Sequence, residues 1–359
     1  MTANHRYEGF LRPDDPLWGA VLAGIPHDFF HLPAYVASCA AHEGGEPLLF
    51  LADAGDRGLA VPLVRRTLAE FGPAYAHHSD VRSPYGYPAP LWWGPSGPER
   101  TAELMGCFED HLRNLGVVSL FLRLNPFLPG PDAELAALGD LRVHGPVVYL
   151  DLRDPEGSWD GISSQNRRFI KAALAAGCTV RHDAWETLDQ VLEAYHHTMG
   201  RLGASPFYFF RRDFFLRLRD GGQGHFHLAT AFDPDGEVAG GMFFTEQGGL
   251  VHAFLCGVRD GWEHLSPAKL LNDALRLWGI RHGFHTLNLG GGVGSLEDGV
   301  LQFKLRFSKR TRDYATFRKV LLPGVYRRLS EGFEPGPAEF FPAYRNPAAT
   351  VLHPAGSGA

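Results

Sequence analysis

The side chain with the clearest chemical potential is a lysine flanked by phenylalanines, in the stretch Phe303-Lys304-Leu305-Arg306-Phe307. This stretch follows a glycine-rich loop, Gly290 to Gly294. A lysine charge placed there can bind a phosphate group or stabilise a developing oxyanion. The alternative interpretation is a surface lysine in an alternating strand, with Phe303 and Phe307 serving only as anchors.

The glycine-rich loop lacks the context of a phosphate-binding loop. No helix with a G-x-G-x-x-G start opens there, and the acidic residues Glu297 and Asp298 follow it. Glycines at this position are better suited to a bulged turn or to close approach of the backbone to a substrate. We therefore place Asn288 and Gly291 among the candidate substrate-binding residues.

A strand–helix–strand unit precedes the lysine and must position it. An apolar strand, Leu250 to Cys256, is followed by a polar loop and by a helix that begins at Ser266 and Pro267. The second strand is His285 to Leu289, so the pattern predicts a parallel crossover. Ser266 is the expected cap of the helix.

The loop before this helix, Gly257 to Leu265, faces a helix N-terminus, which suits an anion. Asp260 and Glu263 in the same loop would repel a pyrophosphate. The charge of the loop therefore weighs against a ligand that carries a pyrophosphate.

Further candidate binding residues lie on the preceding helices. Arg167 belongs to a basic helical turn that binds phosphates or forms a solvated basic face. Thr198 and Arg201 are one turn apart and share a helix face, and Tyr208 follows them. Together these residues resemble an acceptor-binding set.

In the first half, the proline-rich loop Ser83-Pro-Tyr-Gly-Tyr-Pro carries Tyr85 and Tyr87, with two tryptophans downstream. These rings line a groove for a peptide, sugar or ring, or they form a rigid plug over the first core. The sequence leaves both interpretations open.

The length, composition and net charge of the chain limit the class of protein. A chain of 359 residues with 45% apolar content fits two domains of ordinary size. The formal charge of −6 argues against a large generic nucleic-acid surface. No apolar run is long enough to span a membrane and the start lacks a signal peptide's core, so we expect a soluble, cytoplasmic protein.

Metal binding is not indicated. The four cysteines are widely separated, which favours reduced thiols, and no histidine set has convincing metal spacing. For acid–base chemistry, His252, His264 and Asp298 are candidate general bases.

Three stretches resemble motifs of the Fem family, the aminoacyl-tRNA-dependent transferases built from two GNAT-type acyltransferase domains. They are the basic helix Asn166 to Gly177, the stretch Thr198-Met-Gly-Arg201 with Phe207-Tyr208-Phe209, and Phe303-Lys304-x-x-Phe307. The resemblance covers about residues 25–330. The loop at 257–265 lacks the Arg/Gln-x-x-Gly-x-Gly/Ala run of coenzyme A enzymes, as in Fem-like proteins, and no coiled-coil arm is present.

The resemblance implies an α/β fold with mixed sheets, arranged as tandem GNAT-like domains with a cleft between them. We expect the first domain over residues 1–152 on the acceptor side and the second over 153–330 with the catalytic motif. A Pro/Gly/Ala-rich tail follows over 331–359, and we expect its residues 334–359 to be poorly ordered.

The implied function is amide-bond formation, in which an aminoacyl group moves from aminoacyl-tRNA to an amine of a small molecule, peptide or cell-wall precursor. Lys304 and Phe303 are the expected catalytic residues, with aminoacyl-tRNA as co-substrate and no cofactor. The alternatives are an acyl-CoA-dependent N-acyltransferase and a non-catalytic glycan- or peptide-binding module. The oligomeric state stays open.

Overall fold

The computed structural model describes residues 7–292, 298–331 and 340–346. The chain divides into two compact units. Unit 1 comprises residues 1–25, 39–143 and 315–359, and unit 2 comprises residues 26–38 and 144–314. These boundaries differ from the expected ones at 152 and 330, because both units combine segments that are distant in the sequence.

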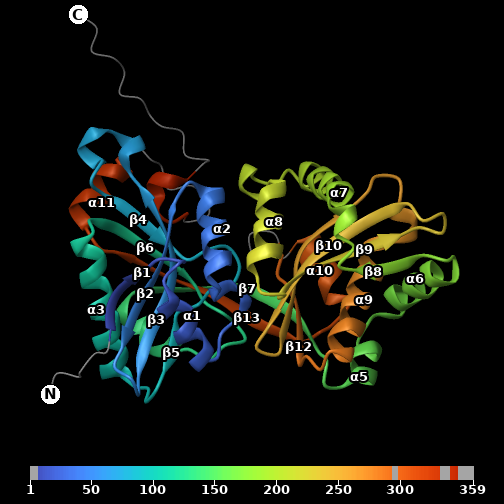
Figure 1. Ribbon diagram of the computed structural model, residues 1–359, viewed down its shortest axis with the longest axis horizontal. Helices are drawn as coiled ribbons and strands as arrows, with labels where there is room; N and C mark the ends of the chain where they lie inside the picture. Colours follow the sequence, from blue (N-terminus) through green and yellow to red (C-terminus); the bar gives the residue numbers. More distant parts are fainter. Residues whose placement is uncertain (1–6, 293–297, 332–339, 347–359) are drawn as a thin grey trace, which may run out of the picture. The chain divides into compact units, whose positions relative to one another are not determined.

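Unit 1 is a mixed sheet with helices packed on it (Figure 1). Its strand order is β1-β2-β3-β4-β6-β13, and β5 pairs with β3. The β4–β6 pair is parallel and the other pairs are antiparallel. The strands are β1 (Tyr7–Leu11), β2 (Glu46–Asp53), β3 (Gly58–Thr67), β4 (Ser79–Arg82), β5 (Leu91–Trp93), β6 (Val117–Arg123) and β13 (Thr311–Val320).

The core of unit 1 forms where helix α3 (Pro98–Asn114) covers this sheet. Leu104, Phe108 and Leu112 recur at a helical spacing of four, so one face of α3 is apolar and buried. The other helices of this part of the chain are α1 (Pro16–Gly24), α2 (Pro33–Glu43, whose first residues belong to unit 2), α4 (Asp132–Leu138) and α11 (Pro323–Ser330).

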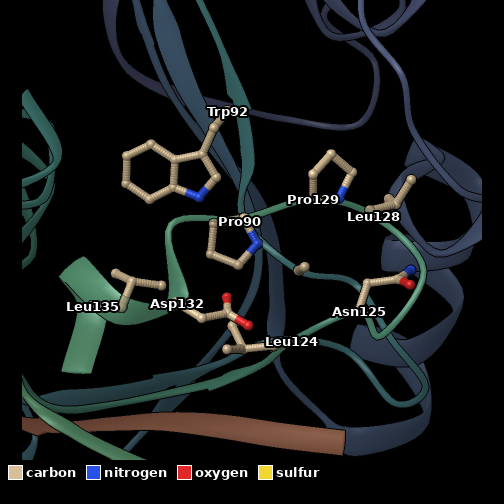
Figure 2. Close-up of a pocket in the computed structure, with 10 residues that line it drawn as sticks. Pro90, Trp92, Leu124, Asn125, Leu128, Pro129, Asp132 and Leu135 are labelled. Carbon is tan, nitrogen blue, oxygen red and sulfur yellow. The ribbon is translucent and has the colours of Figure 1, made fainter. Parts of the chain in front are cut away.

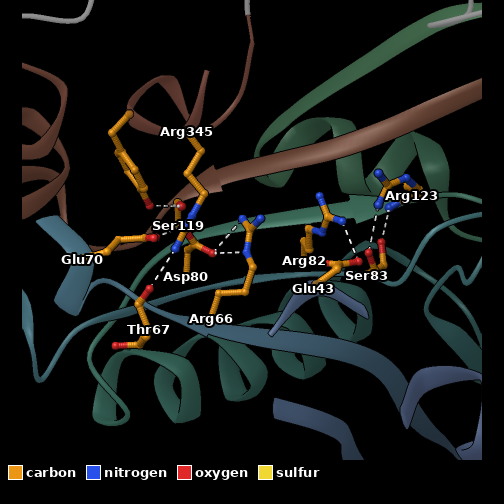
Figure 3. A network of polar contacts seen from close by, with 11 residues as sticks. Glu43, Arg66, Thr67, Glu70, Asp80, Arg82, Ser83, Ser119, Arg123 and Arg345 are labelled. Atoms are coloured by element: carbon orange, nitrogen blue, oxygen red, sulfur yellow. Dashed lines mark hydrogen bonds and ion pairs between the residues drawn. The ribbon is translucent and has the colours of Figure 1, made fainter. Parts of the chain in front are cut away.

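The C-terminal segment 340–346 packs on unit 1, which corrects the expectation of a poorly ordered tail for these residues. Tyr344 is 1% exposed, and its hydroxyl lies 2.8 Å from that of Ser119. Arg345 pairs with the buried carboxylate of Asp80 and, at 2.6 Å, with Glu70 (Figure 3). A buried aromatic ring and an ion pair anchor the segment. The Pro/Gly/Ala-rich composition of the tail did not indicate either contact.

Unit 2 contains a second mixed sheet with the strand order β7-β12-β11-β10-β9-β8. Only the β11–β12 pair is parallel. The strands are β7 (Asp140–Asp151), β8 (Thr179–His182), β9 (Phe226–Phe232), β10 (Val238–Gln247), β11 (Leu250–Val258) and β12 (Thr286–Gly290). The helices are α5 (Pro155–Asp160), α6 (Ser164–Ala175), α7 (Leu188–Arg201), α8 (Arg212–Gly221), α9 (Pro267–Arg281) and α10 (Gly299–Leu305).

Helices cover both faces of this sheet. Gly241 lies so close to Val191 of α7 that an added Cβ would be 2.5 Å from it. The next residue, Met242, belongs instead to the core that contains Leu271 and Leu275 of α9. Because neighbouring strand residues point to opposite faces, α7 and α9 cover opposite sides.

The predicted crossover is present as β11, α9 and β12, with α9 beginning at Pro267. The predicted cap at Ser266 is wrong, and so is the alternative of a strand around Lys304. Ser266 has a left-handed backbone (φ 53°) and makes no side-chain cap, and its hydroxyl instead accepts a hydrogen bond from Lys269. Phe303 and Lys304 lie in helix α10 rather than in a strand, because Asp298 caps a helix there.

Among the residues that the structure describes, no helix has the length and apolar character needed to cross a bilayer.

Candidate functional site

The site is built where two parallel strands of unit 2 stop pairing. The register of β11 and β12 ends at the pair His252 and Asn288. Strand β11 continues to Val258 against β10 alone, after a register shift that leaves Phe254 as an extra residue. Irregularities of this kind often lie beside active sites, where they redirect side chains.

Helix α10 brings Lys304 to the end of β12. Asp298 caps the helix by accepting a hydrogen bond from the N–H of Leu301 at 2.8 Å. In the last turn, Nζ of Lys304 donates a hydrogen bond to the carbonyl oxygen of Gly291 at 2.6 Å. Lys304 is half-buried, which corrects the alternative of an exposed surface lysine.

The surroundings of Lys304 perturb its titration. Burial lowers the pKa of Lys304 to about 8, and the charges of Asp298 and Cys256 oppose this effect. Burial also raises the pKa of the Cys256 thiol to about 12, while nearby Lys304 opposes that shift. The amine of Lys304 therefore lies close to the carbonyl of Gly291, which follows β12, and to the thiol of Cys256 on β11. A lysine with such a pKa is mostly cationic at neutral pH and can stabilise an oxyanion or a phosphate.

The two phenylalanines around Lys304 differ in burial. Phe307 is 1% exposed and anchors the end of α10 in the core of unit 2. Phe303 is only partly buried and packs edge-on against Phe307, with ring centroids 5.4 Å apart. Phe303 is therefore the ring available beside Lys304, as its predicted role requires; that role stays a prediction.

A buried chain of polar groups supports the end of β12. His252 is 2% exposed, and its Nε2 lies 2.9 Å from Oδ2 of Asp28. Its Nδ1 lies 3.0 Å from Nδ2 of Asn288, whose Oδ1 accepts a hydrogen bond from the N–H of Gly290 at 2.7 Å. Gly290 directly precedes the glycine whose carbonyl holds Lys304.

These contacts determine the tautomer of His252. The N–H of Gly290 requires an acceptor, which places the oxygen of the Asn288 amide toward Gly290 and its NH₂ group toward His252. The Nδ1 atom is then an acceptor, and Nε2–H donates to the Asp28 carboxylate. Both ring nitrogens are occupied inside the protein, so His252 is excluded as a general base.

Sequence reasoning missed Asp28. It lies in the segment 26–38, which belongs to unit 2 although about a hundred residues separate it from the rest. It is fully buried and caps the 3₁₀ turn Phe29–His31. A lone carboxylate between apolar and aromatic residues was the available signal, since such a group needs a buried partner.

The other candidate bases have local partners. His264 is exposed, and its Nδ1 lies 2.9 Å from the carbonyl oxygen of Gly261. Asp298 accepts a bond as the cap of α10 and attracts Lys304. Part of the glycine-rich loop, residues 293–297, lies outside the described residues.

The loop between β11 and α9 is held by contacts with α7 and by hydrogen bonds of its own backbone. Arg201 pairs with Asp260 at 2.5 Å and with Glu263 at 3.0 Å. The Thr198 hydroxyl accepts a bond from the N–H of Val258 at 3.1 Å. Backbone N–H groups of the loop are also engaged within the protein, at Arg259, Gly261, Trp262, Leu265 and Ser266. Few backbone N–H groups of this loop therefore remain to bind a pyrophosphate, and its two carboxylates would repel one.

Arg167 and Tyr208 also have structural contacts, and their predicted roles in binding stay predictions. Arg167 pairs with Asp160 of α5 at 3.0 Å. The carbonyl oxygen of Tyr208 accepts a hydrogen bond from the Tyr195 hydroxyl at 2.5 Å. The Tyr208 side chain is half-buried.

Basic groups gather near the C-terminal end of α10. The carbonyl of Arg306 accepts a bond from the N–H of Ser163, which joins α10 to the start of the basic helix α6. Burial and the nearby Arg306 charge lower the pKa of Lys269. Its Nζ also lies 4.4 Å from the centre of the Phe169 ring. Lys269, Arg306 and the start of α6 therefore form a basic neighbourhood that suits a polyanion.

In unit 1, Tyr85 and Tyr87 are half-buried in the proline-rich loop. Asn125 fixes the loop by donating a hydrogen bond to the Tyr87 carbonyl at 3.0 Å. A cavity beside it, lined by Pro90, Trp92 and Asp132 among others, has a volume of about 10 Å³ (Figure 2). That volume suits a single water, so this cavity fits the plug interpretation better than a groove for a sugar. Binding by either tyrosine stays a prediction.

One group of side chains in the described part of unit 1 could hold a metal ion. Ligand atoms of Glu8, Cys107 and His111 lie within 4.8 Å of one another. Burial, together with Glu8, raises the pKa of the Cys107 thiol to about 12. The group offers three protein ligands. The expectation of no resident metal stays a prediction.

The comparisons with known proteins identify the fold. Residues 163–304 match the family described as "Acetyltransferase (GNAT) domain". The crystal structure of FemX matches with a TM-score of 0.69, covering 89% of this chain and 99% of that chain at 12% identity. The chain has a Fem-like fold. The expected tandem GNAT-like architecture is therefore confirmed, and the match to the acetyltransferase domain lies within unit 2.

Two further solved structures match with lower TM-scores. The structure of L-PGS from Bacillus licheniformis matches with a TM-score of 0.54 at 16% identity, covering 86% of this chain and 93% of that chain. The C-terminal domain of a putative lysylphosphatidylglycerol synthetase from Agrobacterium fabrum matches with a TM-score of 0.50 at 14% identity, covering 78% and 86%. No curated protein sequence matches the chain. At such identities the matched structures inform the fold alone.

Proposed function

We propose that the protein is an acyltransferase that moves an aminoacyl group from aminoacyl-tRNA to an amine of a small molecule, peptide or cell-wall precursor. The observation that carries this proposal is Lys304, a half-buried lysine with a pKa of about 8 at the separation of two parallel strands. In open α/β sheets, ligands bind at such separations.

In the proposed reaction, the acceptor amine attacks the ester carbonyl of the donor. The new C–N bond forms a tetrahedral intermediate with a negatively charged oxygen. The ester C–O bond then breaks and releases the tRNA with a free ribose hydroxyl, which takes up, through water or the substrate itself, the proton that the amine nitrogen loses. Lys304 stabilises this oxyanion or the adjacent phosphate of the donor. Phe303 shapes the pocket for the donor end. His252 takes no proton, because its ring nitrogens are occupied.

The donor assignment rests on the loop between β11 and α9. Its Asp260 and Glu263 carboxylates are bound by Arg201, and its backbone donors are largely engaged. These features oppose a pyrophosphate, whereas the basic residues Lys269 and Arg306 favour the phosphates of a tRNA acceptor end.

A coenzyme A-dependent N-acyltransferase is the second candidate, because residues 163–304 match an acetyltransferase domain. Incubation with bulk aminoacyl-tRNA or with acetyl-CoA, with glycinamide as a small acceptor amine, separates the two. We expect only aminoacyl-tRNA to lose its acyl group. Loss from acetyl-CoA alone would support the second candidate, and loss from neither would contradict both.

A further inference from the structure

Asp28, His252 and Asn288 form a continuous hydrogen-bonded chain that ends at the backbone next to Lys304. The successive distances are 2.9 Å from Asp28 to His252, 3.0 Å from His252 to Asn288 and 2.7 Å from Asn288 to the N–H of Gly290. The three side chains are at most 2% exposed. Burial of so many polar groups is costly unless each finds a partner, and here each does.

The chain has a direction that Asp28 imposes. A carboxylate can only accept hydrogen bonds, so Nε2 of His252 must carry the proton. Nδ1 then accepts from the NH₂ group of Asn288, and the amide oxygen is left for Gly290. An amide in place of Asp28 removes this constraint, because it can donate as well as accept.

The far end of the hydrogen-bonded chain, at Gly290, determines where the Gly291 carbonyl lies. The N–H of Gly290 is fixed by Asn288, and Gly290 has a left-handed backbone (φ 77°) that turns the chain out of β12. The carbonyl of the next residue accepts the hydrogen bond of Lys304. A change in the orientation of Asn288 therefore displaces the acceptor that holds the amine.

We propose that Asp28, His252 and Asn288 are positioning residues, which act through Gly290 and Gly291 to hold Lys304 in its productive place. This inference rests on the proposed function of Lys304. It assigns a role in the reaction to the segment 26–38, which lies far from the catalytic motif in sequence.

The test is a double-mutant cycle between Asp28→Asn and Lys304→Met, measured as aminoacyl-tRNA deacylation with glycinamide as acceptor. We expect Asp28→Asn to lower kcat about tenfold, because a small displacement of the Lys304 amine costs rate on this order. The KM for aminoacyl-tRNA should stay within twofold of the wild type. In the Lys304→Met background, the same change should alter kcat less than twofold, because residues that act as a unit are not additive.

His227→Gln is the matched control. His227 also contacts an aspartate in unit 2, with Nδ1 3.0 Å from Asp183, but it lies on β9, which is separated from β12 by β10 and β11. We expect this variant to keep kcat within twofold. An additive effect of Asp28→Asn in the Lys304→Met background, or an equal loss in His227→Gln, would overturn the inference.

A measurement independent of catalysis separates the two proposals. The Gly290 amide should exchange with solvent at least tenfold faster in Asp28→Asn and in His252→Gln than in the wild type, and unchanged in His227→Gln. If Lys304→Met is fully active, the proposed function fails, and the exchange data still decide whether the chain holds Gly290. If Asp28→Asn does not fold, His252→Gln replaces it in the cycle. If neither variant folds, the residues are structural and the inference fails.

Discussion

Replacement of Lys304 by methionine should lower activity and raise stability at the same time. The structure gives the second effect a magnitude. Burial lowers the pKa of Lys304 from its ordinary value of 10.5 to about 8, which corresponds to about 3 kcal/mol at about 1.4 kcal/mol per pH unit. The lost hydrogen bond to Gly291 offsets about 1 kcal/mol of this gain. A net gain of about 1–2 kcal/mol should raise the melting temperature by a few degrees.

The pH dependence has a definite sign. Below pH 8 the lysine is charged in both the folded and the unfolded chain, so the full cost of its burial is present. Between about pH 8 and 10.5 the folded lysine loses its proton while the unfolded chain keeps it, and stability rises. The stability difference between Lys304→Met and the wild type should therefore be largest at pH 7 and shrink above pH 8.

The assay combines thermal unfolding at pH 7 and pH 9.5 with kcat for aminoacyl-tRNA deacylation. We expect kcat to fall about a hundredfold, the size typical of losing one oxyanion donor. Lys309→Met is the control, because Lys309 is an exposed lysine of the same segment. A destabilised Lys304→Met protein, or a constant stability difference across this pH range, would refute the assignment of a costly buried charge.

Four further outcomes are expected. If Lys304 acts as a cation, kcat should fall as pH rises through about 8, and Lys304→Arg should abolish that fall; a rate that increases through pH 8 would instead indicate a base. Acetyl-CoA should give no binding heat at micromolar concentrations, and micromolar affinity would favour the coenzyme A reading. Arg345→Ala should destabilise unit 1 by about 1–3 kcal/mol in urea unfolding, since Asp80 keeps Arg66 as a partner, whereas an unchanged midpoint would deny the segment 340–346 any anchoring role. Elemental analysis should find no stoichiometric metal, and one zinc per chain that is lost in Cys107→Ser would contradict this expectation.

The sequence predicted the parts of the fold that local patterns specify. The crossover of β11, α9 and β12 follows from apolar periodicity with Pro267 at the helix start. The motif around Lys304 was found, but its helix was not. Residues 303–307 alternate between apolar and basic types, a pattern that favours a strand. The structure has a helix there because Asp298 caps its N-terminus.

Long-range partners could not be predicted in the same way. Asp28 meets His252 more than two hundred residues later, and Arg345 meets Asp80 at a similar separation. Neither carries a periodic signal, because one buried ion or hydrogen-bonded pair leaves no pattern along the chain. The register of His252 opposite Asn288 also emerges only when the two strands are aligned.

The interleaved composition of the two units has a consequence for synthesis on the ribosome. Strand β6 of unit 1 receives its neighbour β13 only after the whole of residues 144–314 has been translated, and Asp80 receives Arg345 later still. At the usual elongation rates this interval lasts on the order of ten to thirty seconds. During it, the nascent first unit presents an unpaired strand edge and an incompletely paired aspartate. Chains that terminate early should therefore be removed by proteolysis rather than accumulate as a stable fragment.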